Sequence, residues 1–126
     1  MLAVALADDG EDGDVARARL AREPELHAPH LVDLEVLSVL RRQAGAGLLD
    51  ARRAGFALKD LVDLRMTRYP HVPFARRVWE LRTNLTPYDA AYIALAETLG
   101  CLLVTADARL ARAPGIRCGV EVVHAA

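Results

Sequence analysis

The sequence predicts one α/β domain over residues 1–126, with a parallel sheet flanked by helices. Helix-like and strand-like stretches alternate along the chain, which is the order expected of parallel strands joined by helical crossovers. The length of 126 residues suits a single domain, and 53% apolar with 26% charged residues is the composition of a folded globular chain. No repeat, linker or low-complexity segment divides it.

The first half contains three expected helices and two strands. The stretch "DDGEDGD" is rich in Asp and Gly and indicates a turn, with Asp14 as N-cap of a helix that Pro24 ends. The helix expected at 30–45 is apolar nearly all round and is therefore expected to be buried. In order, the expected elements are a helix at 15–24, a strand at 26–28, helices at 30–45 and 47–61, and a strand at 62–70.

The second half continues the alternation. Thr86 is a suitable N-cap, Pro87 suits the first helical position, and Gly100 suits the end of the same helix. The expected elements are helices at 73–84 and 87–99, a strand at 101–105, a helix at 108–114 and a strand at 120–124.

Two aspartates in the last third are candidate site residues. Asp89 falls in the first turn of helix 87–99, and Asp107 follows the strand that returns from it. A helix cap explains either residue equally well. However, a helix of about 13 residues and the strand after it each span roughly 20 Å, so the chain returns to the edge that it left. Both carboxylates are therefore expected in the crevice beside the strand ends, where α/β proteins place ligands.

Glu35 is the third candidate acid. Its helical neighbours four residues away are Leu31 and Val39, and a charge on that apolar stripe is costly unless it is paired. Its helix also follows a strand, which directs Glu35 toward the same edge of the sheet. The alternative is a half-exposed Glu35 that pairs with an arginine such as Arg42.

Three carboxylates in one crevice would repel one another unless a cation neutralised them. Mg²⁺ and Mn²⁺ are hard ions that prefer carboxylate and water oxygens and need few protein ligands. On a phosphodiester, such an ion polarises the phosphoryl oxygen and generates a hydroxide nucleophile. The residues therefore favour metal-dependent phosphodiester hydrolysis.

Other features narrow the function further. The sequence has no GxSxG, P-loop, GxGxxG, HExxH or CxxC motif, and no signal peptide or membrane span, so a cytoplasmic protein is expected. With a net charge of −1, nucleic-acid binding requires a local basic patch. Arginine provides 15 of the 16 Lys and Arg residues, which suits phosphate contacts, although coding bias explains it as well. The candidate RNA contacts are Arg41, Arg42, Arg76, Arg77 and Arg109.

Several stretches, taken in order, carry a family resemblance. "PHLVDLEVLSVLRR", "RYPH", "WELRTNLTPYDAAYIALA" and "LLVTADARLARAPG" resemble the PIN-domain ribonucleases, specifically the VapC-type toxins of toxin–antitoxin systems, over nearly the whole chain. The resemblance implies a PIN-like three-layer fold and a Mg²⁺- or Mn²⁺-dependent endoribonuclease that cleaves particular RNAs, such as tRNA or ribosomal RNA. It also implies a VapB-type antitoxin as partner, and a homodimer.

The resemblance assigns roles to four residues. Glu35, Asp89 and Asp107 match metal-binding acids of the family, and Thr105 matches the threonine of its T-x-D motif. Thr105 would contact the acids rather than the metal, although a purely structural role in packing the strand explains this threonine equally well.

One departure from the family concerns the first strand. Family members begin with an apolar strand that ends in an aspartate, in the style V-V-D-A-S-x-L, whereas "MLAVALADDG" looks like the following helix running into an acidic turn. We expect the first strand to be truncated, with its aspartate a few residues before Met1. In the alternative, residues 1–6 are the strand and Asp8 or Asp9 takes the role of that acid. A chain that lacks this acid would be an inactive PIN-like subunit that binds an antitoxin without cleaving RNA.

Overall fold

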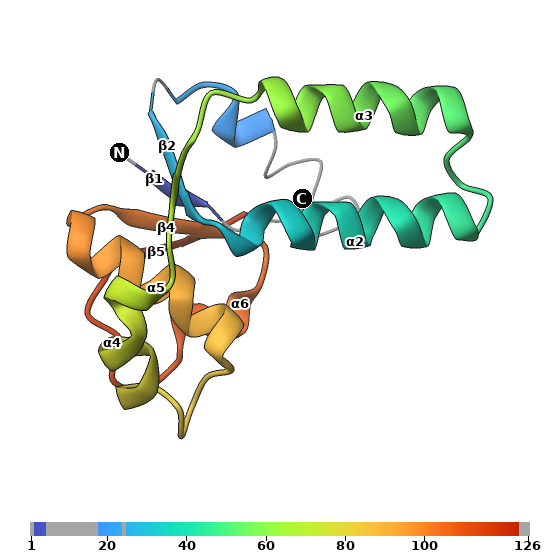
Figure 1. The fold of residues 1–126 in the computed structure, drawn as a ribbon. Helices are drawn as coiled ribbons and strands as arrows, with labels where there is room; N and C mark the ends of the chain where they lie inside the picture. Colours follow the sequence, from blue (N-terminus) through green and yellow to red (C-terminus); the bar gives the residue numbers. More distant parts are fainter. Residues whose placement is uncertain (1, 5–17, 24, 124–126) are drawn as a thin grey trace.

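The computed structural model describes residues 2–4, 18–23 and 25–123 (Figure 1). Within these residues the strands form one parallel sheet in the order β3-β2-β1-β4-β5. The strands are β1 (Leu2–Val4), β2 (Leu26–Pro29), β3 (Thr67–Tyr69), β4 (Leu102–Thr105) and β5 (Val120–Val122). The parallel α/β fold predicted from the alternation of elements is confirmed.

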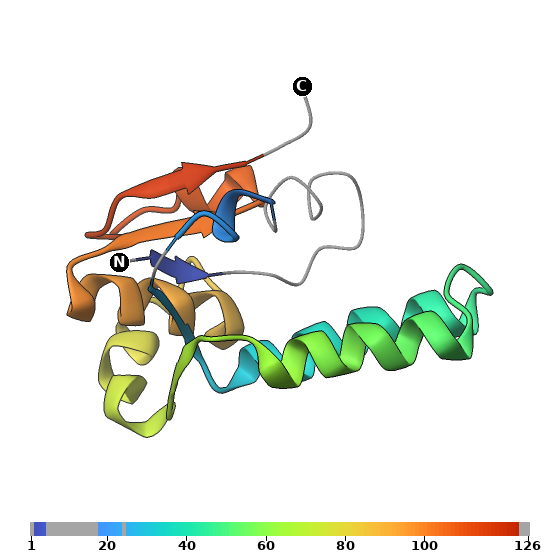
Figure 2. The same cartoon turned by 90° about the horizontal axis from the view of Figure 1, so that it is seen from above.

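The helices lie on the sheet and beside it. Residues 18–20 are helical, within the helix predicted at 15–24. The helices after them are α2 (Leu31–Gly45), α3 (Ala51–Asp63), the short 3-10 helix η1 (Val72–Phe74), α4 (Ala75–Glu80), α5 (Pro87–Leu99) and α6 (Ala108–Ala111). Helix α5 packs against β1, β2 and β4, and α4 packs on α5. Helices α2 and α3 form a hairpin that projects away from the sheet (Figure 2). None of the described helices is long and apolar enough to cross a membrane.

Helix α5 forms the centre of the core. Its residues from Ala90 to Ala96 are all buried, and Ile93 and Leu95 pack with no exposure to solvent. Because the sheet covers one side of α5 and α4 lies on another, an apolar surface all round the helix is stable there. The helix begins and ends as predicted, with Thr86 as N-cap and Gly100 in the left-handed conformation at φ +65°.

Strand β1 lies in the middle of the sheet, between β2 and β4. Ala3 pairs with His27 of β2 and with Leu103 of β4. The expectation that this stretch is helical is therefore wrong for Leu2–Val4, and the structure agrees there with the alternative in which residues 1–6 are the strand. An apolar tripeptide suits the position, because a central parallel strand has both faces covered. A V-V-D-like segment before Met1 stays a prediction.

Helix α2 is less buried than its apolar sequence predicts. Leu31 and Val32 are buried at the start of the helix, but Leu34 is 71% exposed and Leu37 is 38% exposed. The reason is the direction of the helix, because α2 leaves the sheet after its first turns and continues in the projecting hairpin (Figure 1). Only part of its surface is then covered.

Some boundaries also differ from the expectation. Helix α3 begins at Ala51 instead of residue 47, because the Asp50 side chain accepts a hydrogen bond from the Arg53 N–H at 2.8 Å and caps the helix there. Strand β3 is limited to Thr67–Tyr69, which is the stretch paired with β2. The helix expected at 73–84 is divided into η1 and α4 and ends at Glu80.

Side chains of β3 and the residues after it hold α2 in place. Arg68 donates to both carboxylate oxygens of Asp33 in α2, with its Nε 2.8 and 3.0 Å from them, and also to the carbonyl of Leu61 at the end of α3. The His71 Nε2 accepts the Leu31 N–H at 3.1 Å. These contacts fix the direction in which α2 leaves the sheet, and with it the place of Glu35.

Candidate active site

Asp89 is presented by the first turn of α5. The Thr86 hydroxyl accepts the Asp89 N–H at 3.2 Å, and Pro87 stands at the first helical position, so the predicted cap is confirmed. The carboxylate is half-buried. Burial raises the pKa of Asp89, and the negative charge of Asp107 raises it further, against the opposing effects of Arg109 and Thr86.

Asp107 follows β4 and caps α6. Its side chain accepts the Arg109 N–H at 2.9 Å and is also held by the Arg109 guanidinium, with Nη2 to Oδ2 at 2.6 Å. The hydrogen bond from Arg109 lowers the pKa of Asp107. The Thr105 hydroxyl, which is buried, accepts the Asp107 N–H at 3.1 Å. Thr105 therefore does more than pack, because it shapes the turn that carries the aspartate.

Glu35 lies in the second turn of α2, half-buried, and accepts a hydrogen bond from the phenol of Tyr92 in α5. The sequence left open a pairing with an arginine such as Arg42, and the partner is instead this buried tyrosine. Burial raises the pKa of Glu35, the charge of Asp89 adds to the rise, and the Tyr92 hydrogen bond opposes it.

The three acids therefore form an electrostatic chain. Asp89 interacts with Glu35 on one side and with Asp107 on the other. Helices α2, α5 and α6 bring them to the edge of the sheet where the parallel strands end, as the lengths of α5 and β4 predicted.

Tyr92 is a site residue that the sequence reasoning missed. It is 3% exposed, and burial followed by the Glu35 hydrogen bond raises the pKa of its phenol. The signal was present in the spacing, because a residue three positions after Asp89 on a helix lies on the same face. An apolar context made Tyr92 look like a core residue.

Comparison with known proteins places the fold and the motifs in one family. A family model described as "PIN domain" matches residues 2–116. This chain belongs to the PIN-domain family, in its VapC group. Ribonuclease VapC9 of Mycobacterium tuberculosis is 48% identical over 119 residues, which cover 94% of this chain and 90% of the relative. Ribonuclease VapC1 of the same species is 43% identical over 121 residues, with 95% and 90% covered.

Solved PIN-like structures agree with the fold. PAE2754 from Pyrobaculum aerophilum superposes with a TM-score of 0.69 at 25% identity, covering 96% of this chain and 83% of that chain. VapC20 of Mycobacterium tuberculosis, described as a toxin that cleaves the sarcin-ricin loop, superposes with a TM-score of 0.66 at 16% identity, covering 93% and 97%.

The PIN family implies a divalent cation, and the acids fit one in their chemistry. Carboxylate oxygens are the ligands that Mg²⁺ and Mn²⁺ prefer. Burial, and then the charge of a neighbouring carboxylate, raise the pKa values of Glu35 and Asp89, and a cation would favour their ionised forms. Within the described residues, however, no three His, Cys, Asp or Glu side chains are grouped closely enough to hold an ion. Asp107 is instead paired with Arg109.

The described residues do not include a candidate for the aspartate that ends the first strand in the PIN pattern. Asp8 and Asp9, the alternative carriers of that role, lie outside the described residues. The site described by the structure therefore consists of Glu35, Asp89 and Asp107.

The arginines suggested as RNA contacts differ in their surroundings. Arg77 is held by Glu97, with Nε to Oε1 at 2.7 Å, and by the Gly115 carbonyl, so it serves the packing of α4 on α5. Arg76 is exposed, and so is Arg109, whose partner is Asp107. Arg41 and Arg42 lie on exposed positions of α2, on the projecting hairpin.

Proposed function

We propose that this chain is a Mg²⁺- or Mn²⁺-dependent endoribonuclease that acts as the toxin of a toxin–antitoxin pair in the cytoplasm and cleaves specific cellular RNA, such as tRNA or rRNA. The observation that carries the proposal is the coupling of Asp89 to both Glu35 and Asp107 at the edge of the sheet. The names of the VapC relatives, which are ribonucleases, support the same chemistry.

In this proposal Glu35, Asp89 and Asp107 would hold the ion. A bound divalent cation would polarise the phosphoryl oxygen and lower the pKa of water. Tyr92 fixes the Glu35 carboxylate through its hydrogen bond, and Thr105 fixes the turn of Asp107. Arg109 exchanges its contact with Asp107 for a contact with a substrate phosphate, which its 80% exposed side chain can reach.

The proposed protein partner is a VapB-type antitoxin. Between α2, α3 and residues Leu20 and Leu26 lies a cavity of about 440 Å³ with a mostly apolar lining. An apolar segment of the antitoxin fits such a surface. We also propose a homodimer, by family resemblance.

RNA cleavage in the presence and absence of metal tests the function. With Mg²⁺ the purified chain is expected to cut RNA, and EDTA should abolish the cut. Asp89→Asn should reduce the rate by at least about 100-fold, because the ion that would stabilise the developing charge loses a carboxylate ligand. Asp63→Asn changes an exposed acid of α3 that pairs with Lys59 and is the matched control. Cleavage that persists in EDTA or in Asp89→Asn would refute the mechanism.

A second candidate function is an inactive PIN-like subunit that binds an antitoxin without cleaving RNA. The specific observation in its favour is the pairing of Asp107 with Arg109, together with the lack of a three-ligand group within the described residues. Antitoxin binding without any Mn²⁺ binding would favour this candidate over the first.

A further inference from the structure

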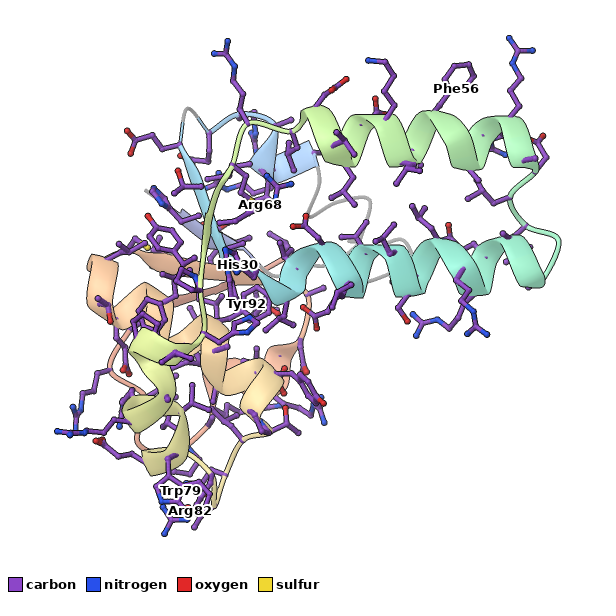
Figure 3. The ribbon with its side chains drawn as sticks, in the orientation of Figure 1. His30, Phe56, Arg68, Trp79, Arg82 and Tyr92 are labelled. Atoms are coloured by element: carbon purple, nitrogen blue, oxygen red, sulfur yellow. The ribbon has the colours of Figure 1, made fainter. Side chains whose placement is uncertain are left out.

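An exposed aromatic and arginine pair lies at the end of α4. Trp79 is 66% exposed, and the Arg82 guanidinium lies over its ring, 4.4 Å from the ring centroid. Figure 3 shows the two side chains together, pointing away from the sheet. The loop after Arg82 leads directly to Thr86 and the first turn of α5, where Tyr88 is also 66% exposed and is followed by Asp89.

The packing of α4 does not account for this exposure. Leu81, at 2% exposed, anchors the segment in the core, and Val78 packs against the same cluster. Trp79 is the only tryptophan of the chain and stays in solvent, although burying an indole normally stabilises a protein. Arg82 is fixed in place, because its Nη1 donates to the Trp79 carbonyl at 2.9 Å.

The charges around Trp79 favour an anionic partner. Arg76 precedes Trp79 by three residues and is exposed, so a second cation lies on the same side of α4. Glu80, the neighbouring acid, is paired with Arg77 at 3.3 Å. An indole with the Arg82 guanidinium over its ring, and Arg76 one helical turn earlier, offers stacking for a base and contacts for phosphate.

The surface suited to a protein partner lies elsewhere. Leu34, Leu48, Leu58 and Val62 are exposed aliphatic residues of the α2–α3 hairpin and its turn. Around the end of α4 and the start of α5 the exposed residues include two aromatic rings, Trp79 and Tyr88, and the cation Arg82, together with the acid Glu80 and the polar Thr83 and Asn84. Unpaired RNA bases, unlike a flat protein surface, match such a combination.

We propose that Trp79, Arg82 and Tyr88 bind single-stranded RNA along the segment that leads into Asp89, with bases stacked on the aromatic rings and Arg82 on the phosphate backbone. The proposal rests on the ribonuclease function proposed above and names the surface that holds the substrate. Stacking is tolerant of base identity, so this surface contributes affinity and not sequence preference.

The fluorescence of Trp79 measures the contact directly, because no other tryptophan is present. The full chain is titrated with a single-stranded oligouridine in EDTA, which prevents metal-dependent cleavage. Saturable quenching is expected, and it should weaken as salt increases. Absence of quenching at RNA concentrations where labelled RNA is fully bound would overturn the proposal.

Variants test whether the contact supports binding. Trp79→Ala should weaken binding of fluorescently labelled oligouridine by roughly 10-fold, within the range for loss of one stacked base, and Arg82→Gln should weaken it and reduce its salt dependence. The matched control is Phe56→Ala, since Phe56 is 56% exposed with Arg52 over its ring at 5.5 Å, on the distant α3. Equal losses in Phe56→Ala and Trp79→Ala would contradict a specific surface.

Other outcomes separate this inference from the proposed function. If Trp79→Ala raises KM for RNA cleavage and leaves kcat unchanged, the result supports both the RNA-binding surface and the ribonuclease function. If the chain binds RNA through Trp79 but never cleaves it, the ribonuclease function fails and the binding surface stands. If Trp79→Ala converts a dimer into a monomer while RNA affinity is unchanged, the surface belongs to a second copy of the chain and the inference is wrong.

Discussion

At the scale of single residues, the acids of the site oppose stability. Glu35 and Asp89 are half-buried, and each has its pKa raised first by burial and then by a neighbouring carboxylate. Keeping both ionised therefore costs free energy in the folded chain. Asp107 differs, because the Arg109 guanidinium lowers its pKa. The three acids should consequently respond differently to pH and to substitution.

Asp89→Asn is predicted to stabilise the chain at neutral pH. The pKa of Asp89 is higher in the folded chain than in the unfolded chain. The protonated carboxyl group therefore contributes its full stabilisation below the ordinary carboxyl pKa of about 4, and this stabilisation is lost as the pH rises through the folded-state pKa. An amide avoids that loss, and the expected gain is on the order of 1 kcal/mol at pH 7.

Thermal unfolding of wild type and Asp89→Asn at several pH values checks this. The difference in stability should shrink as pH falls toward the carboxyl range. Asp107→Asn is the contrast, since it removes an exposed ion pair worth about 0–1 kcal/mol and should not stabilise. A stability gain of Asp89→Asn that is the same at all pH values would contradict the electrostatic account.

Tyr92→Phe is predicted to shift the pH dependence of activity upward. The phenol hydrogen bond opposes the rise in the pKa of Glu35, so its removal raises that pKa further and a higher pH is needed to ionise the carboxylate. The lost charge-assisted hydrogen bond should cost about 1.5–3 kcal/mol of stability. The pH–rate profile is the measurement, with Tyr69→Phe as control, because Tyr69 bonds His27 away from the acids. An unchanged profile in Tyr92→Phe would show that the hydrogen bond does not tune Glu35.

At the scale of elements, α5 connects stability to the site. Its buried middle packs on the sheet, and its first turn holds Asp89 at the exposed end. The cap at Thr86 serves both roles, because the hydroxyl that caps the start of the helix accepts the Asp89 N–H. A weakened cap should therefore affect folding and activity together.

Thr86→Ala is predicted to lower stability by about 1 kcal/mol, the usual cost of an N-cap. The cleavage rate should fall as well, because the first turn of α5 loses the contact that positions Asp89. Thr86→Ser retains a hydroxyl and is the matched control for both chemical denaturation and RNA cleavage. If Thr86→Ala and Thr86→Ser behave alike, the cap does not position the acid.

At the scale of the whole molecule, local signals predicted most of the fold. Spacing and helix-capping chemistry predict the alternation of elements and the caps of α5. They also place Asp89 and Asp107 at the same edge of the sheet. The exposure of α2 was not predictable, because it depends on the direction in which Arg68 and His71 hold the helix. The spacing places Tyr92 on the helix face of Asp89, but nothing in the sequence indicates that its partner is Glu35, which lies far away along the chain.

The same limit explains the first strand. The stretch "LAV" is compatible with a helix or a strand when considered alone, and only its pairing with β2 and β4 makes it the central strand. The pairing of Arg109 with Asp107 is likewise a matter of side-chain geometry that spacing does not give.

Calorimetric titration with Mn²⁺ tests the central claim most directly, namely that Glu35, Asp89 and Asp107 form one cation site. The account predicts saturable binding to the wild type, and at least about 10-fold weaker binding to Glu35→Gln, Asp89→Asn and Asp107→Asn, since each removes a charged ligand. Asp63→Asn should bind as the wild type does. Undiminished Mn²⁺ affinity in all three site variants, or no binding by a wild-type chain that cleaves RNA, would contradict it.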